Sequence, residues 1–304
     1  MHPLTLEPLD QINGFSVRPG LYEINGAMVV PGGVNFTIHS HGATSCELLL
    51  FHRKETVPYV TIPFPSHYRI GHVYSMIIFG LDIEEFEYAY CLDGPYDEGK
   101  GLLFDKKKPL LDIYAKAVTG QSVWGTQNPE GSFYKARVVH DHFDWGKDCN
   151  PLVPMEDLVI YELHVRGFTR HASSGVSHPG TFSGIMEKIP YLKELGVNAV
   201  ELMPIFEFDE MKDSREVDGK TLIDYWGYNP VSFFAPNTSY AAEIEYNREG
   251  TELKELIRAL NQNGIECFLD VVFNHTAEGN KQDVYKRQPL CCIQDWMFWE
   301  PTMA

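Results

Sequence analysis

The sequence predicts a multidomain protein, with an all-β sandwich in its first half and an α/β domain in its second. Short apolar segments separated by Gly and Pro turns run through residues 1 to about 150, the spacing of an immunoglobulin-like β-sandwich. From residue 158 the pattern becomes strand–helix–strand–helix–strand, which is typical of right-handed βαβ units. The polar segment 141–157, with two prolines, lies between them. We therefore predict a domain boundary at about residue 150.

The first half contains strand patterns that alternate between apolar and polar residues and others that are mostly apolar. Val34, Phe36 and Ile38 alternate with polar residues, as expected for a half-buried strand. Further strands are predicted at residues 46–51, 73–78 and 86–90. Residues 93–120 are turn-rich and read as an ordered connector whose Lys106–Lys108 run faces solvent.

The second half begins with a predicted strand at 158–165 and a helical pattern over 182–195, in which Pro190 starts a fresh turn or a kink. A strand at 197–205, a helix ended by Gly264 and a strand at 265–275 follow. The intervening loop 206–245 is unusually long, and such loops are usually functional. This order fits a doubly wound sheet or a (β/α)8 barrel, but no glycine-rich phosphate loop supports nucleotide binding.

The segment 265–275, IECFLDVVFNH, is the central feature of the second half. Its near-continuous apolar run predicts a parallel strand covered on both faces. Asp270 interrupts the run, and a carboxylate there needs a partner. Asn274 and His275 close it at the carboxyl end, where α/β folds place their active sites.

Composition limits the function classes. The formal charge of −17 argues against nucleic acid and anionic membranes as partners. Six cysteines show neither disulfide nor zinc spacing, so core thiols in a reducing compartment are expected. The N-terminus has no signal-peptide pattern and no run reaches membrane-spanning length. We expect a cytoplasmic protein.

Four segments together resemble the α-amylase superfamily of glycoside hydrolases (family 13), most closely its glycogen-debranching and isoamylase-like members. DVVFNH (270–275) looks like its first signature region, and YWGYNPVSFFAPNTSYA (225–241) looks like the loop after its second barrel strand. LVIYELHVRGFT (158–169) is similar to its first barrel strand. Residues 93–120 are similar to the end of the N-terminal sandwich of debranching enzymes, a carbohydrate-binding module of type 48. The resemblance covers residues 15–280, approximately.

The resemblance implies roles for four residues. His275 and Tyr228 correspond to the sugar-binding histidine and the aromatic platform of the cleavage subsite. Asp270 and Asn274 correspond to the structural pair at the strand end. The asparagine is a calcium ligand in many relatives, but debranching members often lack that ion, so no metal or other cofactor is expected. Two further strand carboxylates, Glu162 and Glu201, are expected to form structural ion pairs inside the barrel.

The implied fold is a sandwich with connector (1–150) followed by the first three strands of an incomplete (β/α)8 TIM barrel (151–281). Retaining glycoside hydrolysis needs two carboxylates about 5 Å apart, which the family carries on its fourth and fifth barrel strands. Neither is found in this chain, so catalytic residues are expected to be absent and the chain inactive. A barrel of three strands would also expose apolar surface, which predicts poor solubility and a partly molten state.

The resemblance implies a parent enzyme that cleaves α-1,6 branch linkages in glycogen, limit dextrin or related α-glucans. The alternatives are a pullulanase, a glycogen branching enzyme, or a non-catalytic α-glucan-binding protein. Residues 282–304 are expected to be a non-native tail, because DVYKRQ (283–288) is what a common transposon-end sequencing adapter encodes.

Overall fold

The computed structural model describes residues 6–119, 123–126, 133–140, 142–147, 150–212, 214–243 and 248–275. The described residues form two compact units. One holds residues 6–119 and 133–140, and the other holds residues 123–126 together with the described residues from 142 to 275. The predicted non-native tail, 282–304, lies outside the described residues.

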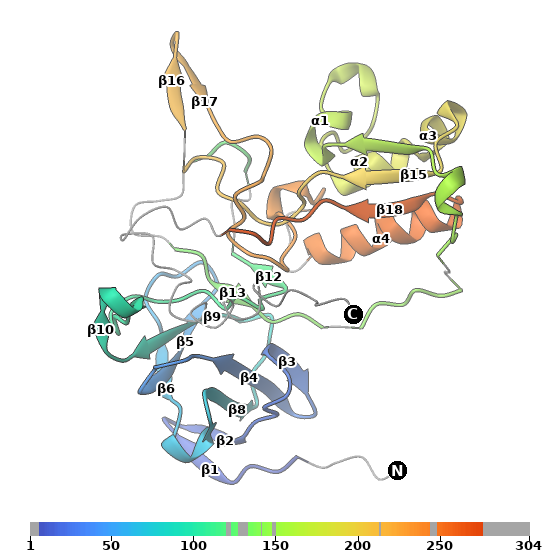
Figure 1. The fold of residues 1–304 in the computed structure, drawn as a ribbon. Helices are drawn as coiled ribbons and strands as arrows, with labels where there is room; N and C mark the ends of the chain where they lie inside the picture. The colour runs from blue at the N-terminus through green and yellow to red at the C-terminus, as the bar shows by residue number, and fades with distance from the viewer. Residues whose placement is uncertain are drawn as a thin grey trace, which may run out of the picture. The chain divides into compact units, whose positions relative to one another are not determined.

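The first unit is a sandwich of two antiparallel sheets (Figure 1). The first sheet has the order β1-β2-β8-β4-β3, with β7 paired to β8: β1 (Asp10–Ile12), β2 (Phe15–Pro19), β8 (Val73–Phe79), β4 (Gly33–His39), β3 (Gly26–Val30) and β7 (Arg69–Ile70). The second has the order β12-β13-β9-β5-β6: β12 (Ala117–Val118), β13 (Ala136–Arg137), β9 (Phe86–Asp93), β5 (Ser45–His52) and β6 (Val60–Pro63). A small ribbon and two 3-10 helices complete the unit: β10 (Tyr96–Asp97), β11 (Leu102–Leu103), η1 (Ser66–Tyr68) and η2 (Glu98–Lys100).

Aromatic side chains join the two sheets of the first unit. Phe36 on β4 meets Tyr88 on β9 edge-on, with ring centroids 5.2 Å apart, and also contacts Phe86. All three are fully buried, so the inner faces of the two sheets share one core. The predicted β-sandwich is confirmed, and its four predicted strands correspond to β4, β5, β8 and β9.

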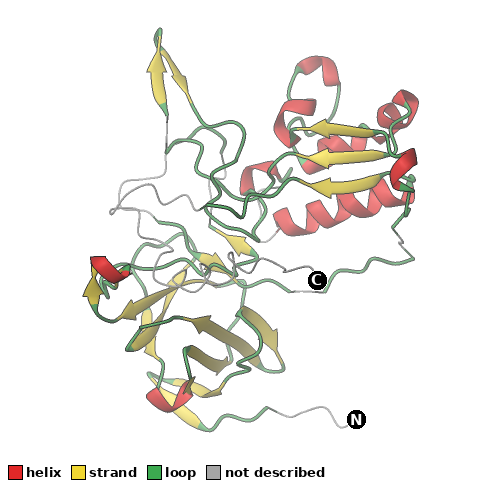
Figure 2. Cartoon of the chain, in the orientation of Figure 1, coloured by secondary structure: helices red, strands yellow, loops and turns green. Residues whose placement is uncertain are grey.

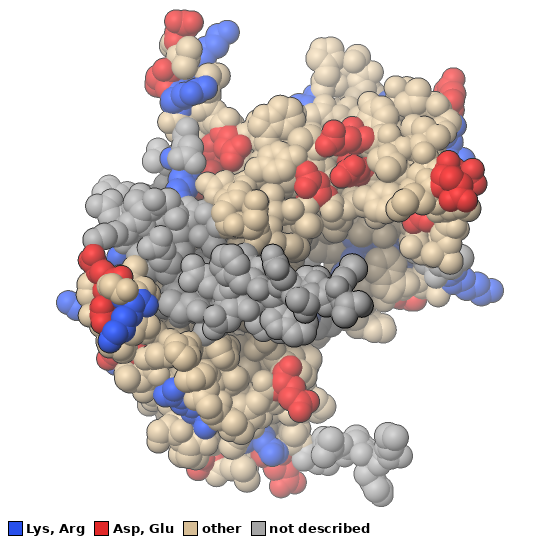
Figure 3. All heavy atoms as spheres, in the orientation of Figure 1, with Lys and Arg blue, Asp and Glu red and all other residues tan. Residues whose placement is uncertain are grey.

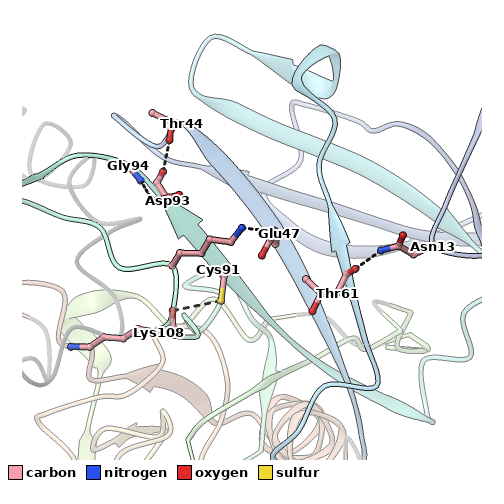
Figure 4. A network of polar contacts seen from close by, with 9 residues as sticks. Asn13, Thr44, Glu47, Thr61, Cys91, Asp93, Gly94 and Lys108 are labelled. Atoms are coloured by element: carbon pink, nitrogen blue, oxygen red, sulfur yellow. Dashed lines mark hydrogen bonds and ion pairs between the residues drawn. The ribbon is translucent and has the colours of Figure 1, made fainter.

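Polar contacts join the end of β9 in the second sheet to neighbouring segments of the chain (Figure 4). The Asp93 carbonyl accepts a bond from Thr44 N (2.7 Å), and the Asp93 carboxylate accepts one from Gly94 N (2.9 Å). The Cys91 thiol donates to the carbonyl of Lys108 at 3.8 Å. Cys91 and Cys46 are buried and free, as expected for core thiols.

The second unit is built on three parallel strands in the order β14-β15-β18 (Figure 2). The strands and the hairpin of this unit are β14 (Ile160–Leu163), β15 (Ala199–Leu202), β18 (Glu266–Leu269), β16 (Arg215–Val217) and β17 (Lys220–Leu222). The helices are α1 (Val165–Thr169), α2 (Phe182–Glu187), α3 (Ile189–Leu195), α4 (Arg248–Gln262), η3 (Met155–Asp157), η4 (Ala172–Ser174) and η5 (Thr238–Tyr240). The sheet is open, as predicted for the start of an unclosed barrel.

Helices α2, α3 and α4 cover one face of this sheet. Their apolar residues form one core with Leu163, Val200 and Leu202 of the strands. Pro190 lies in the first turn of α3, where its missing N–H is not needed, so the predicted fresh turn is confirmed. Gly196 ends α3 in the left-handed conformation, with φ +84°.

The prediction for 265–275 was partly wrong. The strand ends at Leu269. Several large apolar residues at its end and beyond it are partly exposed. Phe268, Leu269, Val271 and Phe273 are 40%, 37%, 41% and 46% exposed. The sequence prediction required both faces of the strand to be covered. Among the described residues, only the face that bears Cys267 packs against helices.

The long loop 206–245 contains a β16–β17 hairpin (Figure 1). Asp218 and Gly219 have positive φ at its turn, 51° and 73°, as a type I′ hairpin turn requires. Every residue of both strands is exposed. Figure 3 shows basic and acidic side chains together at this tip.

Candidate functional site

The carboxyl ends of the three parallel strands lie along one edge. Leu163, Leu202 and Leu269 are partners in register. The pairing continues beyond the strands, since Asp270 N donates to Leu202 O at 2.9 Å. The residues that follow each strand are therefore brought to the same edge.

Tyr228, Asp270, Asn274 and His275 form a hydrogen-bonded group at this edge, here named the strand-end cluster. The Tyr228 hydroxyl donates to Asp270 Oδ2 at 2.7 Å. His275 Nε2 lies 2.8 Å from the carbonyl oxygen of Tyr228, and His275 Nδ1 lies 2.8 Å from Asn274 Oδ1. All four residues that the sequence singled out are thus brought together, and the partner required for Asp270 is Tyr228.

The bonding partners of His275 constrain its protons. The Tyr228 carbonyl can only accept, so Nε2 carries a proton. A neutral ring then has an acceptor at Nδ1, which requires the NH2 group of Asn274 in place of its oxygen. A doubly protonated ring satisfies both contacts as they stand. Either way the imidazole is held between the loop of Tyr228 and the end of the 265–275 segment.

Tyr228 presents an accessible ring next to several carboxylates. The side chain is 40% exposed. The hydrogen bond to Asp270 raises the pKa of Tyr228 to about 12, with smaller contributions from burial and from the charges of Asp270, Glu162 and Glu201. The hydroxyl therefore stays protonated and remains a donor at neutral pH. Asp270 fixes the position of the hydroxyl, and part of the ring stays accessible to solvent.

Within the described part of the chain, Glu162 and Glu201 do not form the expected ion pairs. They are adjacent partners in register on β14 and β15, and no ion pair joins either one to another of the residues that the structure describes. Glu162 is exposed and Glu201 half-buried, so water solvates both charges. The open sheet face explains this outcome, because the expectation assumed the interior of a closed barrel.

Two residues that support the site, His164 and Trp124, were not singled out from the sequence. His164 caps α1 by accepting from Gly167 N at 3.1 Å. Its Nε2 also lies 2.6 Å from the carbonyl oxygen of Tyr225. Trp124 packs edge-on against the rings of His164 and Tyr225. The position of His164 directly after a strand was the available signal, whereas nothing in the local pattern indicated Trp124.

No group of three or more His, Cys, Asp or Glu among the described residues could hold a metal ion. Asp270 already accepts from Tyr228, and Asn274 contacts His275. In the same part of the chain, no helix has the length and apolar character needed to cross a bilayer.

Models of two known protein families match this chain. Residues 160–304 match the alpha amylase catalytic domain, and residues 24–115 match carbohydrate-binding module 48, the isoamylase N-terminal domain. Residues 160–304 therefore belong to the alpha-amylase family, and they follow a module of type 48.

The similar proteins are named as isoamylases, glycogen operon proteins and pullulanases. The chain is 37% identical over 282 residues to "Isoamylase 1, chloroplastic" of Arabidopsis thaliana, covering 88% of this chain and 36% of that protein. It is 35% identical to the "Glycogen operon protein GlgX homolog" of Mycobacterium tuberculosis, covering 87% and 39%. The solved structure of GBS pullulanase SAP in complex with maltotetraose has 26% identity and a TM-score of 0.66, covering 84% of this chain and 34% of that chain. This chain therefore spans about a third of the length of the relatives it matches.

Proposed function

We propose that this chain is the N-terminal part of a debranching glycosidase that acts on α-1,6 linkages in glycogen or a related α-glucan. The strand-end cluster supplies its sugar contacts. The observation that carries the proposal is the bond from Tyr228 to Asp270, which orients an exposed ring at the carboxyl edge of the sheet. The similarity to isoamylases and to a glycogen operon protein supports the substrate class.

The cluster suits a neutral polyol. The ring of Tyr228 offers an apolar face for a pyranose, and the imidazole of His275 can exchange hydrogen bonds with hydroxyl groups. Acidic side chains form patches on the face of the molecule shown in Figure 3, and the net charge is −17. This charge disfavours polyanions. Nucleic acid and anionic membranes are therefore not among the proposed partners, and the proposed location is the cytoplasm.

Hydrolysis requires groups that the cluster does not provide. A retaining mechanism needs a nucleophilic carboxylate and a carboxylic acid about 5 Å apart across the bond. Asp270 is committed to the Tyr228 hydroxyl, and Glu162 and Glu201 lie on strands that the resemblance does not associate with catalysis. We infer that the chain binds α-glucan weakly and does not cleave it.

Binding and hydrolysis are tested on the 304-residue chain. Affinity for maltohexaose is measured by titration calorimetry, and reducing-end release is measured on glycogen. Wild type is expected to bind and to release nothing, and Tyr228→Ala is expected to weaken binding about thirtyfold or more. Tyr191→Ala is the matched control, because Tyr191 is also exposed, at 47%, but lies on α3. No binding by wild type would reject the glucan-site proposal, and release of reducing ends would reject the inactivity.

A pullulanase is the second candidate, because the similar solved structure is a pullulanase. The two candidates differ in the branched substrate that is preferred. Assay of the product of the source open reading frame on pullulan and on glycogen distinguishes them. Faster cleavage of glycogen supports the isoamylase-like activity, and faster cleavage of pullulan supports the alternative.

A further inference from the structure

The segment Tyr225–Tyr228 carries the proposed platform and is held at both ends. At its far end, the hydroxyl and the carbonyl of Tyr228 bond to Asp270 and His275. At its near end, His164 Nε2 lies 2.6 Å from the Tyr225 carbonyl. The rings of His164 and Tyr225 also stack, with centroids 4.1 Å apart and planes 10° apart. The position of Tyr228 therefore depends on His164 as well as on the strand-end cluster.

The hydrogen bonds of His164 define one tautomer. Nδ1 accepts from Gly167 N, so Nε2 carries the proton and donates to the Tyr225 carbonyl. Burial lowers the pKa of His164, the bond to Tyr225 partly offsets that effect, and the charge of Arg166 lowers the pKa further. The neutral ring of His164 thus links the end of β14 to the segment Tyr225–Tyr228 through fixed hydrogen bonds.

Trp124 packs against the aromatic rings around His164. Its ring is stacked with Tyr240, at 19° and a centroid distance of 6.0 Å, and meets His164 and Tyr225 edge-on. The guanidinium of Arg166 lies 4.6 Å from its ring centroid. The backbone is anchored as well, because Gly125 N donates to Glu210 Oε1 at 2.8 Å.

Phe208 extends the contact from Trp124 to the middle of the segment. Its ring centroid is 5.7 Å from that of Trp124, edge-on. A Cβ atom at Gly227 would lie 2.9 Å from the Phe208 ring, so the backbone of the segment rests directly on that side chain. Trp124 is thus packed against residues that support both Tyr225 and Gly227.

We propose that Trp124 and His164 are positioning residues that hold the Tyr225–Tyr228 segment in its binding geometry. Affinity for α-glucan then depends on a tryptophan that precedes the α/β part of the sequence and is not part of the strand-end cluster. The inference rests on the proposed glucan site. A purely structural role would instead lower the stability of the whole second unit without a selective effect on the segment.

The test uses the 304-residue chain with Trp124→Ala and, as the conservative rescue, Trp124→Phe. The control is Trp145→Ala, because Trp145 is also in the second unit but is 39% exposed and packs on Phe143. Amide hydrogen exchange is followed in peptides covering 224–229 and in peptides from α4. Affinity for maltohexaose is measured on the same proteins.

Trp124→Ala is expected to speed exchange at 224–229 about tenfold while α4 stays protected, and to weaken maltohexaose binding about tenfold. Trp124→Phe should restore most of both, and Trp145→Ala should change neither. Unchanged exchange at 224–229, or an equal rise in α4, would overturn the positioning role. If Trp124→Ala does not fold, His164→Phe, which keeps a stacking ring but removes both hydrogen bonds, must show the selective exchange or the inference fails.

The two proposals fail separately. If wild type does not bind maltohexaose but Trp124→Ala selectively loosens 224–229, the glucan site is wrong and the support of the segment stands. If wild type binds and Trp124→Ala binds equally well with unchanged exchange, the support is wrong and the glucan site stands.

Discussion

The hydroxyl of Tyr228 donates a 2.7 Å hydrogen bond to the carboxylate of Asp270, 42 residues further along the chain. This bond joins the loop after the second parallel strand to the residue directly after the third. It satisfies a charge that interrupts an apolar segment, and it orients a ring that is 40% exposed. One contact therefore has both a structural and a proposed binding role.

Replacing Tyr228 separates these roles. Tyr228→Phe keeps the ring face and removes the bond to Asp270, so we expect a loss of about 1 kcal/mol in binding free energy. Tyr228→Ala also removes the ring and should cost about 2 kcal/mol or more. Calorimetric titration with maltohexaose measures both. Equal affinities for the two variants would show that the ring face makes no contact with the sugar.

Gly227 is required for two reasons that a matched pair of variants separates. Gly227 has φ +78° and a Cβ there would meet Phe208 at 2.9 Å, whereas Gly196 has φ +84° and open space around it. Gly196→Ala should cost about 1 kcal/mol from backbone strain alone. Gly227→Ala adds steric overlap, for which overpacking costs of about 1–3 kcal/mol are typical. Urea denaturation measures the difference, and identical losses would mean that Phe208 moves aside freely.

Glu207 makes the stability of the second unit depend on pH. It is fully buried, Thr238 N donates to its Oε2 at 2.7 Å, and its Oε1 has no hydrogen-bond partner among the residues that the structure describes. Burial raises its pKa to about 8, with the bond from Thr238 opposing the shift and the charges of Glu210 and Glu249 adding to it. The folded state thus retains a proton that the unfolded state loses above about pH 4.5.

The stabilising effect of that proton is complete below about pH 4.5 and is lost as the pH rises to about 8, by up to about 1.4 kcal/mol per pH unit. Glu207→Gln, which cannot ionise, is therefore expected to raise the melting temperature of the second unit at pH 8 and to change it little at pH 5. Thermal melts at both pH values test this. A variant that is equally destabilised at both would indicate that the amide cannot replace the protonated carboxyl.

Lys135 and Glu87 form a buried ion pair in the first unit. The Nζ–Oε2 distance is 2.6 Å, and the side chains are 4% and 3% exposed. The Lys135 ammonium also lies over the Phe51 ring and donates to the carbonyl of Glu55. Lys135→Met leaves Glu87 unpaired, for which a loss of about 3–5 kcal/mol is expected.

The double variant Lys135→Met, Glu87→Leu should recover most of that loss, because an apolar pair of similar volume avoids desolvation of both charges. Chemical denaturation of the first unit measures both effects. If the double variant is as unstable as the single one, the contacts of Lys135 with Phe51 and Glu55 are the larger part of its contribution.

The sequence predicted the order of elements because its periodicities are strong and local. Alternation identified β4, a mostly apolar run identified β5, and Pro190 marked the start of α3. These features depend on neighbours within a few residues. The extent of the 265–275 strand was overestimated, because burial of Val271 and Phe273 would need a layer that the described residues do not form.

The candidate site, like the fold, was predicted from the sequence only in part. The sequence by itself determined that Asp270, Asn274 and His275 would be at the carboxyl edge, because strand order and parallel direction place them there, whereas the position of Tyr228 was implied by the family resemblance. Only the tertiary structure decided that Tyr228 is the partner of Asp270, that Glu162 and Glu201 lie side by side on neighbouring strands, and that Trp124 packs against His164 and Phe208. These are contacts between side chains far apart in the chain, and their geometry is set by packing rather than by any local pattern.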